Sequence, residues 1–136
     1  MGATMNLFLD ACAIIYLIEA GSKQGETVRN RVTQHLKNNG TLSVSRLSLL
    51  ECRVMPLKKG DSDLLARYEQ FFELPSLKII ELTEEVVEHS THLRVRYSLR
   101  TPDVLQAACA IMANADQFLT GDKQFLSVQE LQVELV

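Results

Sequence analysis

Short apolar runs that stop at a polar residue recur along the chain and predict buried β-strands. We expect strands at residues 6–9, 41–45, 77–82, 117–120 and 131–135. The pattern is clearest in the third run, which has Ile79 and Ile80 at its centre. No two-residue turn such as Asn-Gly joins two of these runs directly, so the connections between them are predicted to be crossovers rather than hairpins.

Segments with helical periodicity separate the predicted strands. We expect helices at 11–19, 24–38 and 62–72, one after the second strand, one after Thr83 and one from Thr101. The predicted buried faces are Val28, Val32 and Leu36 in one helix, and Leu47, Leu50, Val54 and Leu57 in the helix after the second strand. Thr101-Pro102-Asp103 is a start signal, with a capping threonine, a proline at the first helical position and an acid near the positive helix end.

Strands that alternate with helices predict an α/β fold with a central, mainly parallel β-sheet flanked by helices on both faces. The 136 residues contain no internal repeat, low-complexity segment or linker, so we expect a single domain over 1–136. At this length folding buries about two-thirds of the surface of the unfolded chain, which allows a core without metals or disulfides.

Composition places the chain among ordinary globular proteins. Hydrophobic residues make up 46% of the chain, and no apolar run approaches the roughly 20 residues that cross a bilayer. The start of the chain lacks the order of a signal peptide. Cys12, Cys52 and Cys109 lie far apart in apolar surroundings and are predicted to be reduced thiols, so we expect a soluble cytoplasmic protein. His89 and His92 suit a solvated helix face better than a metal site.

The charge balance limits the classes of molecule that the protein is expected to bind. Fourteen Lys and Arg against seventeen Asp and Glu give a net charge of −3. This balance argues against a protein that coats DNA non-specifically. It is compatible with a nucleic-acid enzyme, because acids gathered at a metal site can mask a basic rim. With 6% aromatic residues and no Trp, extensive base stacking is not expected.

Four acidic residues are predicted to lie at one edge of the sheet, the carboxyl edge at which parallel sheets bind ligands. Asp10 ends the first strand, Glu51 lies in the first turns of the helix after the second strand, and Asp122 closes the strand at 117–120. Asp103 begins a helix that must deliver the chain to the start of a parallel strand. The beginning of that helix therefore lies near the carboxyl edge as well.

Each acid also has a purely structural explanation. Asp10 is a possible helix cap, Ser48 and Glu51 fit a capping box, Asp103 complements its helix dipole, and Asp122 is a turn former. These explanations do not account for four acids at one edge, because carboxylates roughly 5 Å apart repel one another by about 3 kcal/mol per pair at an effective dielectric constant of 20. A cation is therefore expected among them.

Oxygen ligands without His or Cys favour Mg²⁺ or Mn²⁺, and Mg²⁺ completes its octahedron with water and substrate phosphate oxygens. Such an ion lowers the pKa of a bound water and stabilises charge on a scissile phosphate. The predicted chemistry is hydrolysis of a phosphodiester. None of the six glycines opens a nucleotide-hydrolase phosphate loop, so ATP is not implied.

Four segments, in this order, resemble the PIN-domain ribonucleases, and most closely the VapC-like toxins of prokaryotic toxin–antitoxin pairs. The segments run from Leu7 to Ala11, from Ser45 to Glu51, from Thr101 to Ala108 and from Phe118 to Phe125. The resemblance spans nearly the whole chain. It implies a PIN-like three-layer fold, a Mg²⁺- or Mn²⁺-dependent endoribonuclease acting on RNA, a homodimer, and inhibition by a small antitoxin protein of the VapB type.

By position, the acids that match the family's catalytic and metal site are Asp10, Glu51, Asp103 and Asp122. Thr120 matches a hydroxyl that supports this site. Two positions depart from the family pattern. The family often has Thr or Ser and then Asn after the first Asp, where this chain has Ala11 and Cys12. After the Thr it often has Asn or Arg, where this chain has Gly121.

Six basic residues near the acids are candidates for RNA contact: Arg46, Arg53, Arg94, Arg96, Arg100 and Lys123. Each also has a simpler role in solubility, and those at helix ends complement the helix dipole.

Two alternative functions stay open. A receiver-like domain also holds Mg²⁺ at strand-end acids beside a phosphoacceptor Asp, assisted by a Thr and a Lys as Thr120 and Lys123 would assist. Such domains usually have two adjacent acids after the first strand, whereas Asp10 stands alone. A noncatalytic PIN-like binding module is the other alternative, and the presence of all four acids argues against it.

Overall fold

The computed structural model describes residues 5–19 and 21–136, and shows a five-stranded sheet in the order β3-β2-β1-β4-β5. The strands are β1 (Asn6–Leu9), β2 (Thr41–Ser45), β3 (Leu77–Ile80), β4 (Gln117–Thr120) and β5 (Val133–Leu135). Every neighbouring pair is parallel, which confirms the predicted α/β class. The first four residues, which belong to the segment without a signal-peptide pattern, lie outside the described residues.

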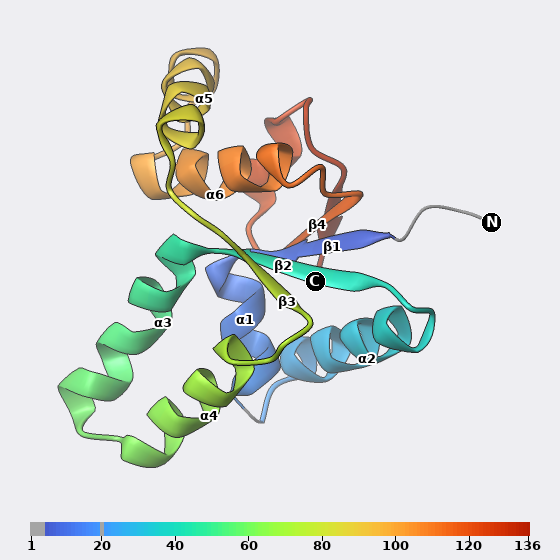
Figure 1. Cartoon of the computed structure of the whole chain (residues 1–136), viewed down its shortest axis with the longest axis vertical. Helices are drawn as coiled ribbons and strands as arrows, with labels where there is room; N and C mark the ends of the chain where they lie inside the picture. The colour runs from blue at the N-terminus through green and yellow to red at the C-terminus, as the bar shows by residue number, and fades with distance from the viewer. Residues whose placement is uncertain (1–4, 20) are drawn as a thin grey trace.

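Helices cover both faces of the sheet (Figure 1). The helices are α1 (Ala11–Ile18), α2 (Lys23–Lys37), α3 (Arg46–Lys59), α4 (Ser62–Phe72), α5 (Glu84–Arg96) and α6 (Thr101–Met112), with a short 3₁₀ helix η1 (Lys123–Ser127). In Figure 1, α1 to α4 lie below the sheet and α5 and α6 above it. Among the described residues, the helices are too short or too polar to span a membrane.

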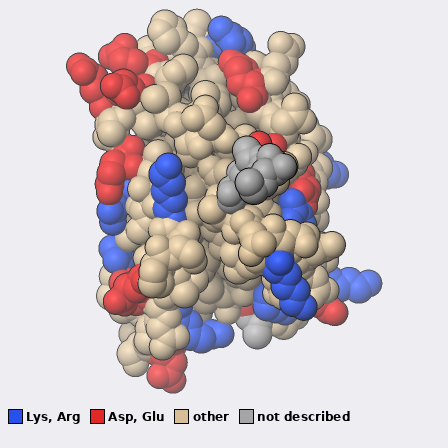
Figure 2. Space-filling view, turned by 45° about the vertical axis from the view of Figure 1, so that its right-hand side comes forward, with Lys and Arg blue, Asp and Glu red and all other residues tan. Residues whose placement is uncertain are grey.

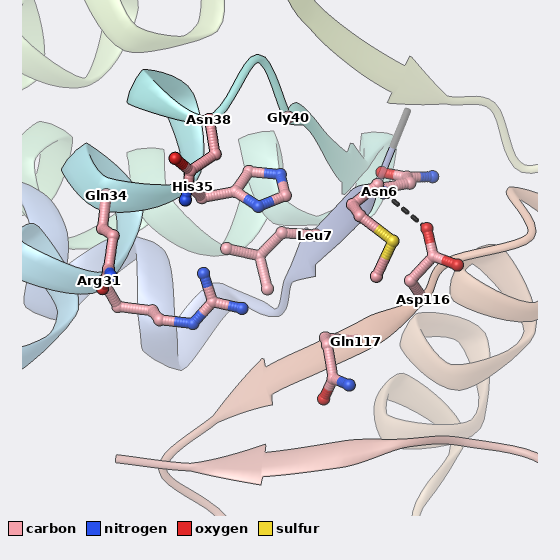
Figure 3. A pocket seen from close by; sticks show the side chains of 10 residues that line it. Asn6, Leu7, Arg31, Gln34, His35, Asn38, Gly40, Asp116 and Gln117 are labelled. Carbon is pink, nitrogen blue, oxygen red and sulfur yellow. Dashed lines mark hydrogen bonds between the residues drawn. The ribbon is translucent and has the colours of Figure 1, made fainter. Parts of the chain in front are cut away.

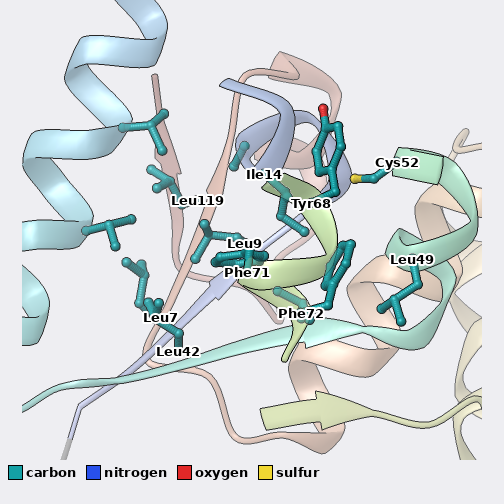
Figure 4. Packing of buried hydrophobic residues seen from close by; sticks show 14 residues of the cluster. Leu7, Leu9, Ile14, Leu42, Leu49, Cys52, Tyr68, Phe71, Phe72 and Leu119 are labelled. Atoms are coloured by element: carbon teal, nitrogen blue, oxygen red, sulfur yellow. The ribbon is translucent and has the colours of Figure 1, made fainter. Parts of the chain in front are cut away.

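Alternation along the central strands builds two cores. Leu7 and Leu9 of β1 point toward α1 to α4, where they meet residues such as Ile14, Tyr68 and Phe71 (Figure 4). The residue between them, Phe8, points to the opposite face and stacks on Phe118 of β4, with ring centroids 5.4 Å apart. Because successive strand residues face opposite sides, a short central strand anchors both helical layers at once.

The buried face predicted for α3 is wrong. Leu50 and Leu57 are 60% and 61% exposed, and Val54 is also exposed. The helix instead buries Leu49, Cys52 and Pro56. These residues also recur at spacings of three and four, and Leu49 and Cys52 belong to the core formed with α1 and α4 (Figure 4). A helix with two apolar stripes buries the stripe that neighbouring helices can approach more closely. In α3 this is the stripe of Leu49, Cys52 and Pro56, which has the smaller side chains.

Smaller corrections apply to three other elements. In α2, Leu36 is exposed and His35 is buried in its place, with the His35 Nε2 2.7 Å from the Thr41 carbonyl oxygen. The ring fits because Gly40 beside it has no side chain: a Cβ there would lie 2.3 Å from the imidazole. β3 stops two residues before the predicted end and β5 starts two residues after the predicted start.

Adjacent leucines on α3 test the corrected face. We expect Leu49→Ala to lower the free energy of unfolding by about 2–5 kcal/mol, because Leu49 is only 4% exposed and its removal leaves a cavity. The same change at Leu50 is expected to cost less than about 0.5 kcal/mol. Urea unfolding of the two variants measures the difference, and equal losses would contradict this orientation of α3.

Candidate functional site

The four acids predicted from the sequence line one cavity of about 550 Å³ at the carboxyl edge of the sheet. Its lining comprises Asp10, Ala11, Cys12, Glu51, Arg100, Pro102, Asp103, Gln106, Gly121, Asp122, Lys123 and Phe125. The acids come from four separate stretches of the chain, after β1, within α3, at the start of α6 and after β4. The parallel topology brings these stretches together.

Asp10 is the most buried of the acids, at 4% exposed. Its Oδ1 accepts a hydrogen bond of 2.9 Å from the backbone N–H of Ala13, so it caps α1 as the simpler explanation predicted. Its Oδ2 accepts one of 2.5 Å from the Thr120 hydroxyl. The pKa of Asp10 is raised to about 6, chiefly by burial and also by the charges of Asp122 and Glu51, which together outweigh the lowering effect of the two hydrogen bonds.

Thr120, for which the family resemblance implies a supporting role, lies beside Asp10. It is fully buried at the end of β4. While its hydroxyl donates to Asp10, its Oγ1 accepts a 3.0 Å hydrogen bond from the backbone N–H of Asp122. A single side chain therefore links the backbone that carries one acid to the carboxylate of another.

Glu51 does not belong to a capping box, so the structural explanation for this acid is wrong. The cap of α3 is Ser45, whose Oγ accepts from the backbone N–H of Leu47. The helix therefore starts before Ser48 and places Glu51 in its second turn. Glu51 is half-buried, and its Oε1 accepts a 3.0 Å hydrogen bond from Gln106 Nε2. Burial and then the charge of Asp103 raise the pKa of Glu51.

Asp103 is buried at the start of α6, although the predicted cap is wrong: Thr101 is the first helical residue, and Arg100 precedes it without a side-chain cap. The Oδ2 of Asp103 has no hydrogen-bond partner. Its nearest cation is the Nε of Arg100 at 3.5 Å, on a side chain that is 79% exposed. This carboxylate is therefore only weakly compensated within the chain.

Asp122 also forms the turn that its structural explanation predicted. Its Oδ1 accepts a 2.9 Å hydrogen bond from the backbone N–H of Gln124 and so starts η1. A capping role and a place in the acidic cavity are thus compatible for Asp122, as they are for Asp10.

The two departures from the family pattern lie next to each other. A Cβ at Gly121 would lie 3.1 Å from the Sγ of Cys12 and 2.9 Å from the ring of Tyr16. The space that a side chain after Thr120 would need is therefore taken by Cys12 and Tyr16. Burial and the neighbouring charge of Asp10 raise the pKa of Cys12, which favours the neutral thiol.

The donor set suits a hard divalent cation. The cavity collects four carboxylates against two basic side chains, and it holds two buried oxygens without partners, on Asp103 and Gln106. In the described part of the chain, no three His, Cys, Asp or Glu side chains are arranged to hold an ion by themselves. An ion here would therefore keep water ligands or draw the carboxylates inward, and Mg²⁺ commonly keeps its waters.

A second cavity, of about 290 Å³, lies at the opposite, amino edge of the sheet (Figure 3). Its one acid, Asp116, accepts a 2.6 Å hydrogen bond from the backbone N–H of Asn6. Its Arg31 pairs with Glu134 at 2.7 Å. The charged groups of this cavity thus have partners within the fold, so the acidic cavity is the better candidate site.

Most of the six basic candidates for RNA contact do not lie at the acidic cavity. Ion pairs hold three of them: Arg46 with Glu81, Arg53 with Glu69 and Arg96 with Glu130. Arg94 lines a groove between α5 and α6. Arg100 and Lys123 line the acidic cavity. On the face shown in Figure 2, basic and acidic side chains are interspersed.

Sequence reasoning missed Gln106 as a site residue. The signal was present: Gln106 is a polar residue in a largely apolar helix, three positions after Asp103 and therefore on the same helix face. Its amide contacts both Ser48 and Glu51 of α3.

The chain is thus an α/β protein whose parallel sheet carries a cavity lined by four carboxylates at its carboxyl edge. Residues 7–131 match the family model of the PIN domain. The chain belongs to the PIN-domain family. No curated protein matches the chain.

Solved structures show the same fold. A chain of VapBC2 from Rickettsia felis, crystallised with a promoter DNA fragment, superposes with a TM-score of 0.79 at 24% identity, over 97% of this chain and 99% of that chain. VapC20 of Mycobacterium tuberculosis, a toxin that cleaves the sarcin-ricin loop, gives a TM-score of 0.73 at 16% identity, over 94% and 98%. VapBC-1 from nontypeable Haemophilus influenzae gives 0.72 at 22%, over 96% and 98%. At these identities the likeness concerns the fold.

The burial of Asp10 gives a stability prediction. Raising its pKa from 3.8 to about 6 means that the folded protein loses stability as pH rises through this interval and Asp10 ionises. We expect Asp10→Asn, in chelator at pH 7, to raise the free energy of unfolding by up to about 3 kcal/mol, because Asn keeps the cap acceptor without the charge. The gain should shrink toward pH 4.

Urea unfolding at several pH values measures this gain. Asp116→Asn is the matched control, since Asp116 accepts a strong hydrogen bond from a backbone N–H and its neutralisation is expected to bring no gain. A variant of Asp10 that is less stable than the wild type at pH 7 would contradict the account.

Proposed function

We propose that this chain is a Mg²⁺- or Mn²⁺-dependent endoribonuclease, and that it acts as the toxin of a toxin–antitoxin pair. The observation that carries the proposal is the convergence of Asp10, Glu51, Asp103 and Asp122 on one cavity. Membership of the PIN-domain family supports the same chemistry. A single nuclease domain over residues 1–136 is part of the proposal.

In this proposal the four carboxylates hold the metal ion. When bound, the ion supplies an activated water and stabilises negative charge on the scissile phosphate. Thr120 keeps Asp10 oriented by donating to its Oδ2. Arg100 and Lys123, at the cavity wall, attract the RNA backbone and place a phosphate next to the acids.

Asp10 is poorly suited to the phosphoacceptor role of a receiver-like domain. Both of its carboxylate oxygens already accept hydrogen bonds, from Ala13 and Thr120, and the side chain is almost fully buried. Acetyl phosphate would phosphorylate a receiver and leave this protein unmodified. A noncatalytic PIN-like module is the remaining alternative, and it would bind without cutting.

The partners belong to the proposal as well. Structural neighbours include VapBC assemblies and a toxin–antitoxin complex from Klebsiella pneumoniae. We propose for this chain a small antitoxin of the VapB type, a homodimeric state and a cytoplasmic location. Co-expression with the product of a small adjacent reading frame, followed by co-purification, tests the antitoxin, and sedimentation of the isolated protein tests the dimer.

Cleavage of RNA is the direct test of the proposal. Purified protein incubated with total cellular RNA and Mn²⁺ is expected to give a discrete set of new ends that chelator abolishes. Asp103→Asn should lower the cleavage rate by at least about 100-fold, because it removes a carboxylate from the metal site. Asp116→Asn, at the other edge of the sheet, should cut like the wild type. Cleavage that persists in the Asp103 variant or in chelator would refute the proposal.

Metal binding gives a second test that needs no substrate. An ion that binds the folded state alone stabilises it by about 2.7 kcal/mol when its concentration is 100 times its Kd. We expect millimolar Mg²⁺ or Mn²⁺ to raise the melting temperature of the wild type and to leave that of Asp103→Asn nearly unchanged. Thermal melts with and without metal measure both, and an unmoved wild type would contradict a metal site.

A further inference from the structure

Gln106 is a buried amide in the wall of the acidic cavity, with half of its hydrogen-bonding capacity unused. The side chain projects from α6 and is 3% exposed. Its Nε2 donates to Ser48 Oγ at 2.9 Å and to Glu51 Oε1 at 3.0 Å, which uses both amide hydrogens. Its Oε1 is buried and has no partner.

The orientation of this amide follows from its neighbour. An ionised carboxylate only accepts hydrogen bonds, so the nitrogen of Gln106 must face Glu51. The reverse orientation would set two acceptor oxygens against each other. The free oxygen therefore has a defined orientation on a side chain that lines the acidic cavity, as does Asp103 one helical turn earlier on α6.

An unsatisfied buried acceptor is costly and is uncommon in folded proteins, so it indicates a missing donor. None of the groups that the described residues offer around the cavity supplies one to this oxygen. Water bound to a divalent cation is a strong donor, and Mg²⁺ commonly retains several waters in protein sites. Partners in a second layer around a metal orient its ligands in this way.

We propose that Gln106 is a positioning residue of the metal site: its Nε2 fixes the carboxylate of Glu51, and its Oε1 accepts a hydrogen bond from a water molecule bound to the ion. This inference rests on the proposed function. It differs from a purely structural role, in which Gln106 only ties α6 to α3 through Ser48 and Glu51.

The affinity for Mn²⁺ alone separates these two roles. The full chain is titrated with Mn²⁺, and the free ion is measured by electron paramagnetic resonance. The titration gives the Kd of the Mn²⁺ complex. We expect Gln106→Met, which keeps the length and removes both polar atoms, to weaken Mn²⁺ binding by about 10- to 100-fold. Gln70→Met, the same change on the exposed surface of α4, is the matched control and should bind like the wild type.

A double-mutant cycle tests whether Gln106 acts through Glu51. We expect the losses in Mn²⁺ affinity of Gln106→Met and Glu51→Gln to be non-additive, because the second change removes what the first positions. Additive losses, or a Kd for Gln106→Met within about twofold of the wild type, would overturn the inference. If Gln106→Met fails to fold, Gln106→Asn takes its place, since the shorter amide stays polar but cannot keep both contacts.

The outcomes for the wild type distinguish this inference from the proposed function. A wild type that binds Mn²⁺ and cuts RNA, beside an unimpaired Gln106 variant, overturns the role of Gln106 alone. A wild type that neither binds Mn²⁺ nor cuts RNA overturns both.

Discussion

Electrostatic repulsion among carboxylates at the ends of parallel strands is the constraint on which the site depends. Crossover connections make all five strands parallel, so their carboxyl ends lie at the same edge of the sheet. The acids that follow β1 and β4 therefore meet there, together with those of α3 and α6. Water is largely excluded from Asp10, so its charge is costly, and Thr120 and the start of α1 compensate only part of that cost. The fold thus gathers negative charge that the chain itself compensates only in part.

The hydrogen bonds around the cavity are of two kinds: some cap helices, and others orient the acidic side chains. Asp10 and Asp122 each give one oxygen to a helix start. Thr120 and Gln106 orient Asp10 and Glu51, and both reach across from another segment of the chain. Both of these caps lie in the lining of the acidic cavity. Each cap uses only one oxygen of its carboxylate, so a capping role does not prevent Asp10 or Asp122 from lining the acidic cavity.

Much of this arrangement could be predicted from the sequence. The apolar runs gave the strands to within two residues at each end, and the parallel topology was sufficient to gather the four acids. The buried face of α3 could not be predicted, because two stripes with similar spacing compete and only tertiary packing against α1 and α4 decides between them. For Gln106 the sequence showed a polar residue on the same helix face as Asp103, but not its contacts with Ser48 and Glu51, which lie more than fifty residues earlier. The contact of Cys12 with the position of Gly121 was invisible for the same reason.

The hydrogen bond from Thr120 to Asp10 joins residues 110 positions apart. During synthesis, the ribosome must therefore release nearly the whole described chain before β4 can pair with β1 and close the cavity. Nascent chains that stall earlier lack both this strand and Asp122. The acidic cavity is therefore completed only late in synthesis, when β4 and Asp122 join the segments that carry the other three acids.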